Sequence, residues 1–293
     1  MTSSSILTAR DDDGFSFYQY DPSVAAAAIF AVLFLVTTAY HCWQAWTKRT
    51  LYFIPLLIGG HFEWTGYIFR IISSYNLTST SIFIIQTLLL LLPPSLFAAS
   101  IYMVLGRIIL FTNGESMAPI RANWLTKIFV IGDVFSFLVQ AGGGSMMASA
   151  DSQNLGKTLV IAGLVLQILF FGLFVGTSIL FHRRLALSPT SASLRAPWQK
   201  YLWALYAASL LIFIRSIFRI FEFAGGHDGT LMSSEVYIYV FDAVLMLGVM
   251  VVFNVVHPGE IIGRRKGDLK GAVPLNGGLE NGSESFIAGG ERR

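Results

Sequence analysis

The sequence predicts an all-α integral membrane protein, a bundle of seven transmembrane helices with the N-terminus outside and the C-terminus in the cytosol. Hydrophobic residues make up 54% of the chain and charged residues 13%, whereas soluble proteins carry roughly 25% charged residues. The apolar residues form blocks of about twenty, the length at which a helix crosses a hydrocarbon core. Basic residues flank alternate ends of these blocks, which fixes the expected orientation.

The chain divides into three expected parts. Residues 1–23 are an extracellular segment that lacks the pattern of a cleavable signal peptide and contains Asp11, Asp12 and Asp13. Residues 24–257 are the seven-helix domain. Residues 258–293 are polar and rich in glycine, so they cannot bury enough apolar surface to fold, and we expect a disordered cytosolic tail.

The seven helices are expected where the apolar blocks lie, because lipid cannot satisfy free backbone groups. The expected spans are residues 24–46, 51–72, 82–111, 124–147, 158–181, 201–223 and 236–256.

Local features support these spans in order. The first ends before Lys48-Arg49, and the second begins directly after that pair. The third contains Pro93-Pro94, and proline removes helical hydrogen bonds, so we expect a kink there. The fourth holds the glycine triplet 142–144, a second expected irregularity. The fifth ends before Arg183-Arg184, the sixth follows Lys200, and the seventh is the last apolar block.

Charge distribution predicts the orientation of the bundle. Basic loops face the cytosol, and the basic residues outside the spans lie mostly at one set of alternating ends, with only Arg10 and Lys157 at the other, so we expect the N-terminus outside. The opposite ends are acidic, with Asp21, Asp151, Asp228 and Glu235. The outer loop after the second span carries Asn76 in an Asn-Leu-Thr sequon, where we expect N-glycosylation. The basic residues are Lys48, Arg49, Arg121, Lys127, Arg183, Arg184, Arg195, Lys200, Arg264, Arg265 and Lys266.

Polar residues inside the spans recur at helical spacing. An ionisable group at the bilayer centre costs at least ~3 kcal/mol, so each one is a functional candidate. In the second span Glu63, Tyr67 and Arg70 share one stripe, and Gln167 lies in the fifth. Equivalent stripes are Asp133, Ser136 and Gln140 in the fourth span, Arg215, Arg219 and Glu222 in the sixth, and Glu235, Tyr239 and Asp242 in the seventh.

These stripes predict faces that point to one shared polar interior. Several of the residues map to the outer half of the membrane, which predicts a polar cavity that opens to the exterior. They either fix helix packing through ion pairs or bind the polar head of an amphiphile, and the two roles are compatible. The candidate substrate-binding residues are Glu63, Tyr67, Arg70, Asp133, Gln140, Gln167, Arg215, Arg219, Glu222 and Asp242.

Other membrane functions fit the sequence less well. A retinal-binding pump needs a lysine in the middle of its last span, which is absent here. A zinc hydrolase needs converging ligands, but His61 alone lies well inside the membrane. We therefore expect no enzymatic activity, no cofactor or metal, and no nucleic-acid partner. A seven-helix receptor that signals to a cytosolic partner stays open.

The strings within the spans resemble those of the fungal lipid-translocating exporters, the RTA-like seven-helix proteins linked to aminocholesterol resistance, sphingoid long-chain-base export and porphyrin uptake. The resemblance runs from about Tyr18 to Gly259. It rests on Tyr20-Asp21-Pro22-Ser23, Gly59-Gly60-His61-Phe62-Glu63 with Gly66-Tyr67 and Arg70, Ala98-Ala99-Ser100-Ile101-Tyr102 with Gly106-Arg107, Lys127-Ile128-Phe129 with Asp133 and Gln140, Gly163 with Gln167, Arg215 with Arg219 and Glu222, Asp242, and His257-Pro258-Gly259.

The resemblance implies movement of amphipathic lipid-like molecules, such as sphingoid long-chain bases or sterol-like toxins, across the plasma membrane. The expected partners are membrane lipids and an amphipathic small molecule. The alternative is a seven-helix receptor or sensor of lipid asymmetry. A sphingoid base carries an amine, which favours Glu63, Asp133 and Asp242 as its direct partners, held in place by the arginines.

Overall fold

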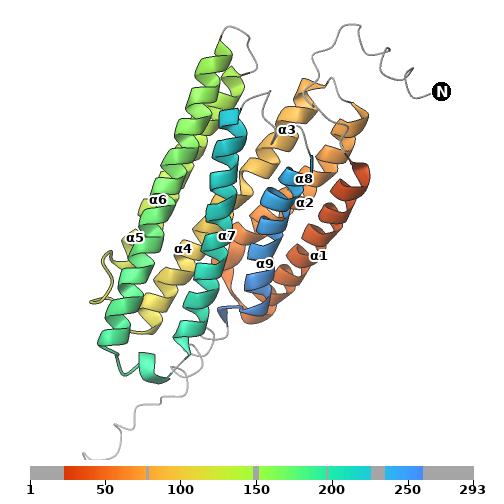
Figure 1. The fold of residues 1–293 in the computed structure, drawn as a ribbon. Helices are drawn as coiled ribbons and strands as arrows, with labels where there is room; N and C mark the ends of the chain where they lie inside the picture. The colour runs from red at the N-terminus through yellow and green to blue at the C-terminus, as the bar shows by residue number, and fades with distance from the viewer. Residues whose placement is uncertain (1–22, 77–78, 148–151, 196, 226–234, 260–293) are drawn as a thin grey trace, which may run out of the picture.

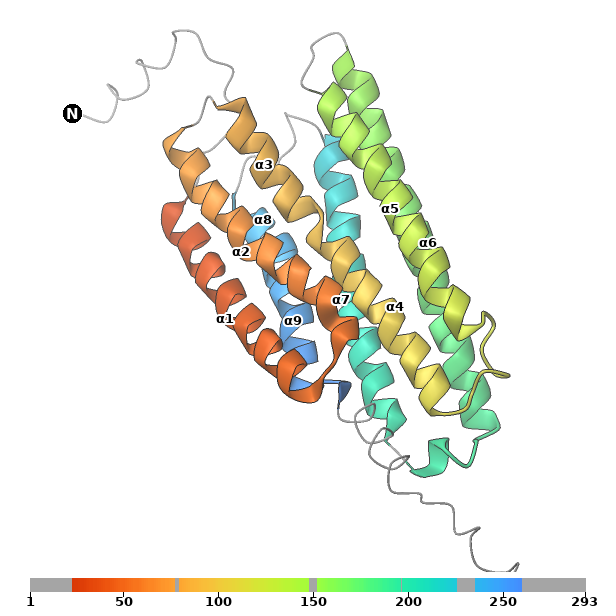
Figure 2. The same cartoon turned by 180° about the vertical axis from the view of Figure 1, so that it is seen from behind.

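A computed structural model describes residues 23–76, 79–147, 152–195, 197–225 and 235–259, and these are helical with short connections (Figure 1). Residues 1–22, 77–78, 148–151, 196, 226–234 and 260–293, which include most of the expected extracellular segment and the expected tail, lie outside the described residues. The helices run up and down the bundle in alternation, so sequence neighbours are antiparallel (Figures 1 and 2).

The observed helices agree closely with the expected spans, except that three of those spans are divided and several extend further. The elements are α1 (Val24–Lys48), η1 (Leu51–Phe53), α2 (Ile54–Tyr75), α3 (Thr80–Leu91), α4 (Pro93–Phe111), α5 (Ala122–Met146), α6 (Gln153–Leu187), η3 (Ser193–Arg195), α7 (Trp198–Gly225), α8 (Glu235–Ile238), the π-helix η4 (Tyr239–Val244) and α9 (Leu245–Val255).

Within the described residues, six helical segments are long and apolar enough to cross a membrane, which makes this an integral membrane protein. Large apolar side chains face outward along them, for example Ile131, Leu173 and Trp203. Helix α2 has the length of a span, but its mean hydropathy is lower because it contains Gly59, Gly60, His61, Glu63 and Arg70. The six segments are α1, Ser81–Phe111 across α3 and α4, α5, α6, α7, and Glu235–Val255 across α8 to α9.

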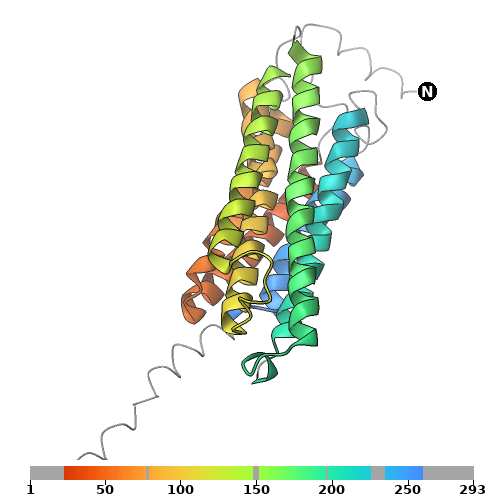
Figure 3. The same ribbon diagram turned by 90° about the vertical axis from the view of Figure 1, so that its left-hand side faces the viewer.

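Helices α5 and α6 form a long hairpin (Figure 3), in which α5 packs on α4 and α6 packs on α7. Helix α2 packs between α1 and the α3–α4 segment. Glycines allow the α5–α6 backbones to approach closely. A Cβ placed on Gly143 would lie 2.7 Å from the carbonyl oxygen of Gly156, and one on Gly163 would lie 2.9 Å from that of Ser136.

Two helices are irregular at the depth of the polar residues. The expected kink is confirmed, because the chain bends at Leu92 between α3 and α4, where Pro93 and Pro94 begin the second segment. The glycine triplet does not break α5, which continues to Met146, so the second expected irregularity is wrong. The last span has an irregularity that was not expected, a π-helix that contains Asp242.

Candidate functional site

The inward-facing stripes predicted from spacing are confirmed by burial. Glu63, Tyr67 and Arg70 on α2 are each at most 3% exposed, and the stripe on α5 is buried in the same way. Their polar contacts form two groups on opposite sides of the α3–α4 break. We name them the charged cluster, which contains Glu63, Tyr67, Arg70, Arg215, Arg219, Glu222, Glu235, Tyr239 and Asp242, and the α5 cluster, which contains Ser95, Tyr102, Asp133, Ser136, Gln140 and Gln167.

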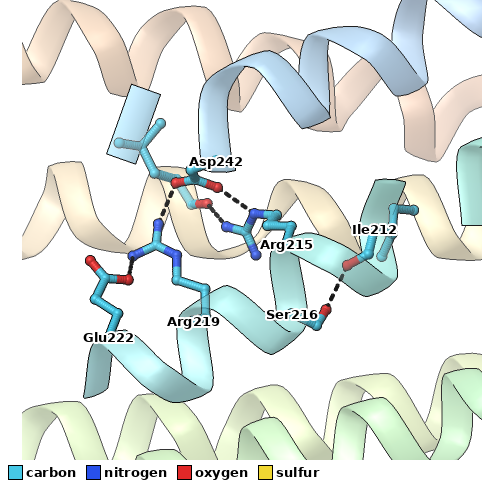
Figure 4. Close-up of polar contacts among 7 residues, drawn as sticks. Ile212, Arg215, Ser216, Arg219, Glu222 and Asp242 are labelled. Atoms are coloured by element: carbon cyan, nitrogen blue, oxygen red, sulfur yellow. Dashed lines mark hydrogen bonds and ion pairs between the residues drawn. The ribbon is translucent and has the colours of Figure 1, made fainter. Parts of the chain in front are cut away.

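Asp242 is the centre of the charged cluster. Its two carboxylate oxygens accept hydrogen bonds from Arg215 Nε and from Arg219 Nη2, and Arg219 Nη1 also lies 3.0 Å from Glu222 Oε2 (Figure 4). The spacing on α7 places Arg215, Arg219 and Glu222 on one face, and the π-helix η4 positions Asp242 opposite them. Two arginines and two acids therefore neutralise each other away from water.

Arg215 also connects this cluster to the proline break. Its Nη2 donates to the carbonyl oxygen of Leu90 at 3.0 Å. In a continuous helix that carbonyl would accept from the residue four positions later, which is Pro94 and has no N–H. Arg215 therefore donates the hydrogen bond that the proline cannot. Inside a membrane no water is available to bond the free carbonyl oxygen, so a protein donor is needed.

Arg70 pairs with an acid that the sequence did not single out as a site residue. Arg70 Nη2 lies 2.8 Å from Glu235 Oε1, and Arg70 Nε donates to Tyr239 Oη at 3.2 Å. The other oxygen of Glu235 accepts from the backbone N–H of Ser23 at 2.8 Å. The sequence places Glu235 both among the acidic residues of the outer ends and on the stripe with Tyr239 and Asp242, but spacing does not show that Arg70 is its partner.

Glu63 differs from the other acids of the charged cluster. It is 2% exposed, and within the described part of the chain its carboxylate has neither an ion pair nor a hydrogen bond to Oε1. Electrostatically it interacts with Asp242, Arg215 and Arg219. Two neighbouring atoms, Tyr67 Oη and Arg219 Nε, are also buried without a hydrogen-bond partner among the described residues.

The three unpartnered atoms offer one ionic acceptor, one hydroxyl and one donor. Buried polar atoms are normally hydrogen-bonded, so a concentration of unsatisfied ones marks a place where another polar group can bind. Tyr67 is held by stacking, with its ring 5.6 Å from that of Phe34 and 5.8 Å from that of Phe30. The position of its hydroxyl is therefore set by α1.

The α5 cluster has no ion pair among the described residues, and its side chains are joined by hydrogen bonds. Tyr102 donates its hydroxyl to Asp133 Oδ2 at 2.7 Å. Gln140 Nε2 donates to Gln167 Oε1 at 3.0 Å, and Gln167 Nε2 donates to Ser95 Oγ at 3.1 Å. The ring of Tyr102 packs against that of Phe174, with the two ring centroids 4.4 Å apart.

The expected single polar interior is thus corrected to two groups with different partners. Both reach the α3–α4 break, since Arg215 binds Leu90 before the two prolines and Gln167 binds Ser95 after them. The sequence could not separate the groups, because spacing shows which residues share a face but not which helix that face meets.

Asn76 is exposed directly after α2, as its predicted glycosylation requires.

The chain can be compared with known proteins on this basis. The profile of the family described as "RTA1 like protein" matches residues 56–265. The chain belongs to the RTA1-like family. It is 39% identical over 273 residues to Protein RTA1 of Saccharomyces cerevisiae, which covers 84% of this chain and 86% of that protein.

Two other relatives of this RTA1-like protein carry names that refer to protoporphyrin and to sphingoid long-chain bases. It is 38% identical over 282 residues to Protoporphyrin uptake protein 1 of Saccharomyces cerevisiae, covering 83% of this chain and 92% of that protein. It is 26% identical over 276 residues to Sphingoid long-chain base transporter RSB1 of the same species, covering 81% of this chain and 72% of that protein. No solved structure matches the chain.

Proposed function

We propose that this RTA1-like protein moves amphipathic lipid-like molecules with a cationic head, such as sphingoid long-chain bases, toward the outer leaflet of the plasma membrane. The relative named a sphingoid long-chain base transporter supports the substrate class. The observation that carries the proposal is Glu63, a buried carboxylate without an ion pair among the described residues.

The charged cluster selects for the sign of the head. Arg70, Arg215 and Arg219 each have an acidic partner, so an acidic head would have to displace a carboxylate from them. An ammonium group needs no such displacement, because it pairs with Glu63. Hydroxyl groups of the same head bind Tyr67 Oη and Arg219 Nε, which satisfies the buried atoms that lack partners.

The roles of the other candidate residues follow from their contacts. Asp242, Glu222 and the arginines hold the charged cluster together, so they position Glu63 and Tyr67 and do not bind the amine themselves. Asp133 keeps the hydrogen bond from Tyr102 and, with Gln140 and Gln167, packs α5 against α4 and α6. The protein works without enzymatic activity, metal or cofactor in this proposal.

The proposal places seven spans in the membrane, with α2 as the additional one and the N-terminus outside. The ends of α1 and α6 that carry Lys48, Arg183 and Arg184 lie together at one end of the bundle, which supports a cytosolic position for that end (Figure 1). The opposite end carries Asn76, so its glycosylation is expected from this orientation.

Labelling with a membrane-impermeant maleimide tests the orientation in intact cells. Cys42 is the one cysteine, so Cys42→Ala provides a cysteine-free background. We expect Asn76→Cys to react from outside and Glu115→Cys, in the exposed loop at the other end, to react after permeabilisation alone. The reverse pattern would overturn the orientation.

Purified protein in liposomes tests the function itself. A labelled sphingoid base is added on one side and its appearance on the other is followed. We expect faster passage than in protein-free liposomes, and Glu63→Gln is expected to remove the acceleration. Equal passage with and without protein overturns transport and favours the receptor or sensor of lipid asymmetry, which binds a lipid but moves none.

A further inference from the structure

The charged cluster is one charge away from neutrality. It contains three basic side chains, Arg70, Arg215 and Arg219, each paired with an acid. It contains four acidic side chains, Glu235, Asp242, Glu222 and Glu63, and the first three of these take part in the pairs. If all seven are ionised, the sum is three positive against four negative charges, and the excess lies on Glu63.

Among the described residues, no further charged group around Glu63 offsets this excess. Helix α3 has no acidic or basic residue. The titratable groups with acidic or basic side chains on α1 are the buried His41, which is bonded to the carbonyl oxygen of Met250, and Lys48 at the helix end. On α4 the charged residue is Arg107, which lies over the Tyr52 ring near the other end of the bundle. The groups that act on Glu63 are Asp242, Arg215 and Arg219, and Tyr67 follows one turn later on the same helix.

A single positive charge restores neutrality, and two species can supply it. A proton on Glu63 makes the carboxyl neutral, and a monovalent ammonium head makes an ion pair with it. Uncompensated burial of a charge in a membrane costs several kcal/mol, so the state with neither is disfavoured. The state with both would carry an excess positive charge in the same place and is disfavoured for the same reason.

We propose that Glu63 is a proton-binding site and that the proton and a cationic amphiphile occupy it alternately, so that the protein exchanges one for the other. This inference rests on the proposed function and adds its coupling ion. The exchange is balanced: the carboxyl O–H bond breaks, the proton leaves to water, and the ammonium group takes its place beside the carboxylate. Each exchange moves one positive charge in either direction and leaves the charge of the cluster unchanged.

The exchange also restricts the substrate. A neutral amphiphile of the same shape cannot replace the proton, because it would leave the carboxylate charged and unpaired. A diamine would leave one uncompensated positive charge in the charged cluster. The cluster therefore selects a head with one positive charge.

Proton release on binding tests this site without any transport step. Full-length protein in nanodiscs of neutral lipid is titrated with a sphingoid base by calorimetry in several buffers with different ionisation enthalpies, which gives the number of protons released. We expect about one proton released per amine bound, since binding of one ligand is linked to loss of the other. The N-acetylated base, which has no charge, is expected to release none.

Three variants sharpen the titration. Glu63→Gln has no carboxyl proton to release, so we expect no proton release on binding. We also expect its affinity for the sphingoid base to fall at least about tenfold, as for removal of a charge-assisted hydrogen bond. Glu63→Asp keeps a carboxylate and is expected to keep the release, which separates the role of the charge from effects on folding. Glu115→Gln, in an exposed loop, is the matched control and is expected to behave as the wild type.

The outcomes separate this inference from the proposed function. If the amine binds and crosses liposomes but the wild type releases no proton, or if Glu63→Gln releases as many as the wild type, the proton site is overturned and transport stands. If one proton is released on binding but no flux occurs in liposomes, Glu63 is a proton-linked amine site and transport is overturned. If the wild type binds no amine, both are overturned.

Discussion

The charged cluster and the α5 cluster use buried polar groups in different ways. In the charged cluster, arginines and acids from α2, α7 and the last span neutralise one another, and one acid, Glu63, is left over. In the α5 cluster, the single acid Asp133 accepts from Tyr102, and the amides Gln140 and Gln167 bond each other. The charged cluster depends on charge balance, so Glu63 can bind either a proton or a cation. The α5 cluster depends on close packing.

Asp242→Asn is expected to have the largest effect, because it removes the shared partner of Arg215 and Arg219 and leaves buried positive charge. Breaking a buried ion pair by removing one partner costs about 3–5 kcal/mol. Thermal unfolding of the purified protein, followed by fluorescence-detected size exclusion, measures the loss. Glu63→Gln lies in the same cluster and removes no ion pair, so we expect its midpoint to be unchanged or higher. Equal stability of Asp242→Asn and the wild type would contradict the assigned ion pairs.

Gly143→Ala tests whether packing dominates on the other side of the bundle. Its Cβ would lie 2.7 Å from backbone atoms of both Gly156 and Val160, so α5 and α6 must move apart. Overpacking of this kind costs about 1–3 kcal/mol.

The neighbouring glycine provides the control for this substitution. A Cβ on Gly144 meets nothing within 4 Å, and alanine favours the helix by up to about 1 kcal/mol over glycine. Opposite shifts of the unfolding midpoint are expected for Gly143→Ala and Gly144→Ala. Identical shifts would show that the close approach of α5 and α6 is not what limits stability there.

The sequence predicted much of this arrangement for identifiable reasons. The stripes of Glu63 and Arg215 were assigned to the interior because ionisable groups avoid lipid, and the kink at Pro93-Pro94 followed from the missing N–H groups. The pairing of Arg70 with Glu235 depends on how two distant helices pack, which spacing does not encode. The π-helix that presents Asp242 is not marked by any proline or glycine within its residues, so the sequence does not predict it.

Tyr102→Phe is expected to cost about 1–3 kcal/mol, because it removes the hydroxyl that donates to Asp133 Oδ2 and leaves the buried carboxylate without a hydrogen bond among the described residues. A second substitution, Asp133→Asn, in the same chain removes the charge and is expected to recover part of the loss. Thermal unfolding of the two variants checks both effects. A double variant less stable than Tyr102→Phe would mean that the carboxylate has a favourable partner other than Tyr102.

Gln140→Leu is expected to have the smallest effect, about 1 kcal/mol, for the loss of one hydrogen bond to Gln167. Flux of the sphingoid base, corrected for the amount of folded protein, should stay within about twofold of the wild type, because the substitution leaves the charged cluster intact. A much larger loss of flux would place the α5 cluster in the path of the substrate.

The most direct test of the account compares one acid from each region, Glu63→Gln and Asp133→Asn, in the same liposome flux assay at matched amounts of folded protein. We expect Glu63→Gln to lose at least about tenfold of the sphingoid-base flux, since it removes the carboxylate that pairs with the amine, while Asp133→Asn keeps most of it. Unchanged flux in Glu63→Gln, or an equal loss in both variants, would contradict the assignment of amine binding to the charged cluster.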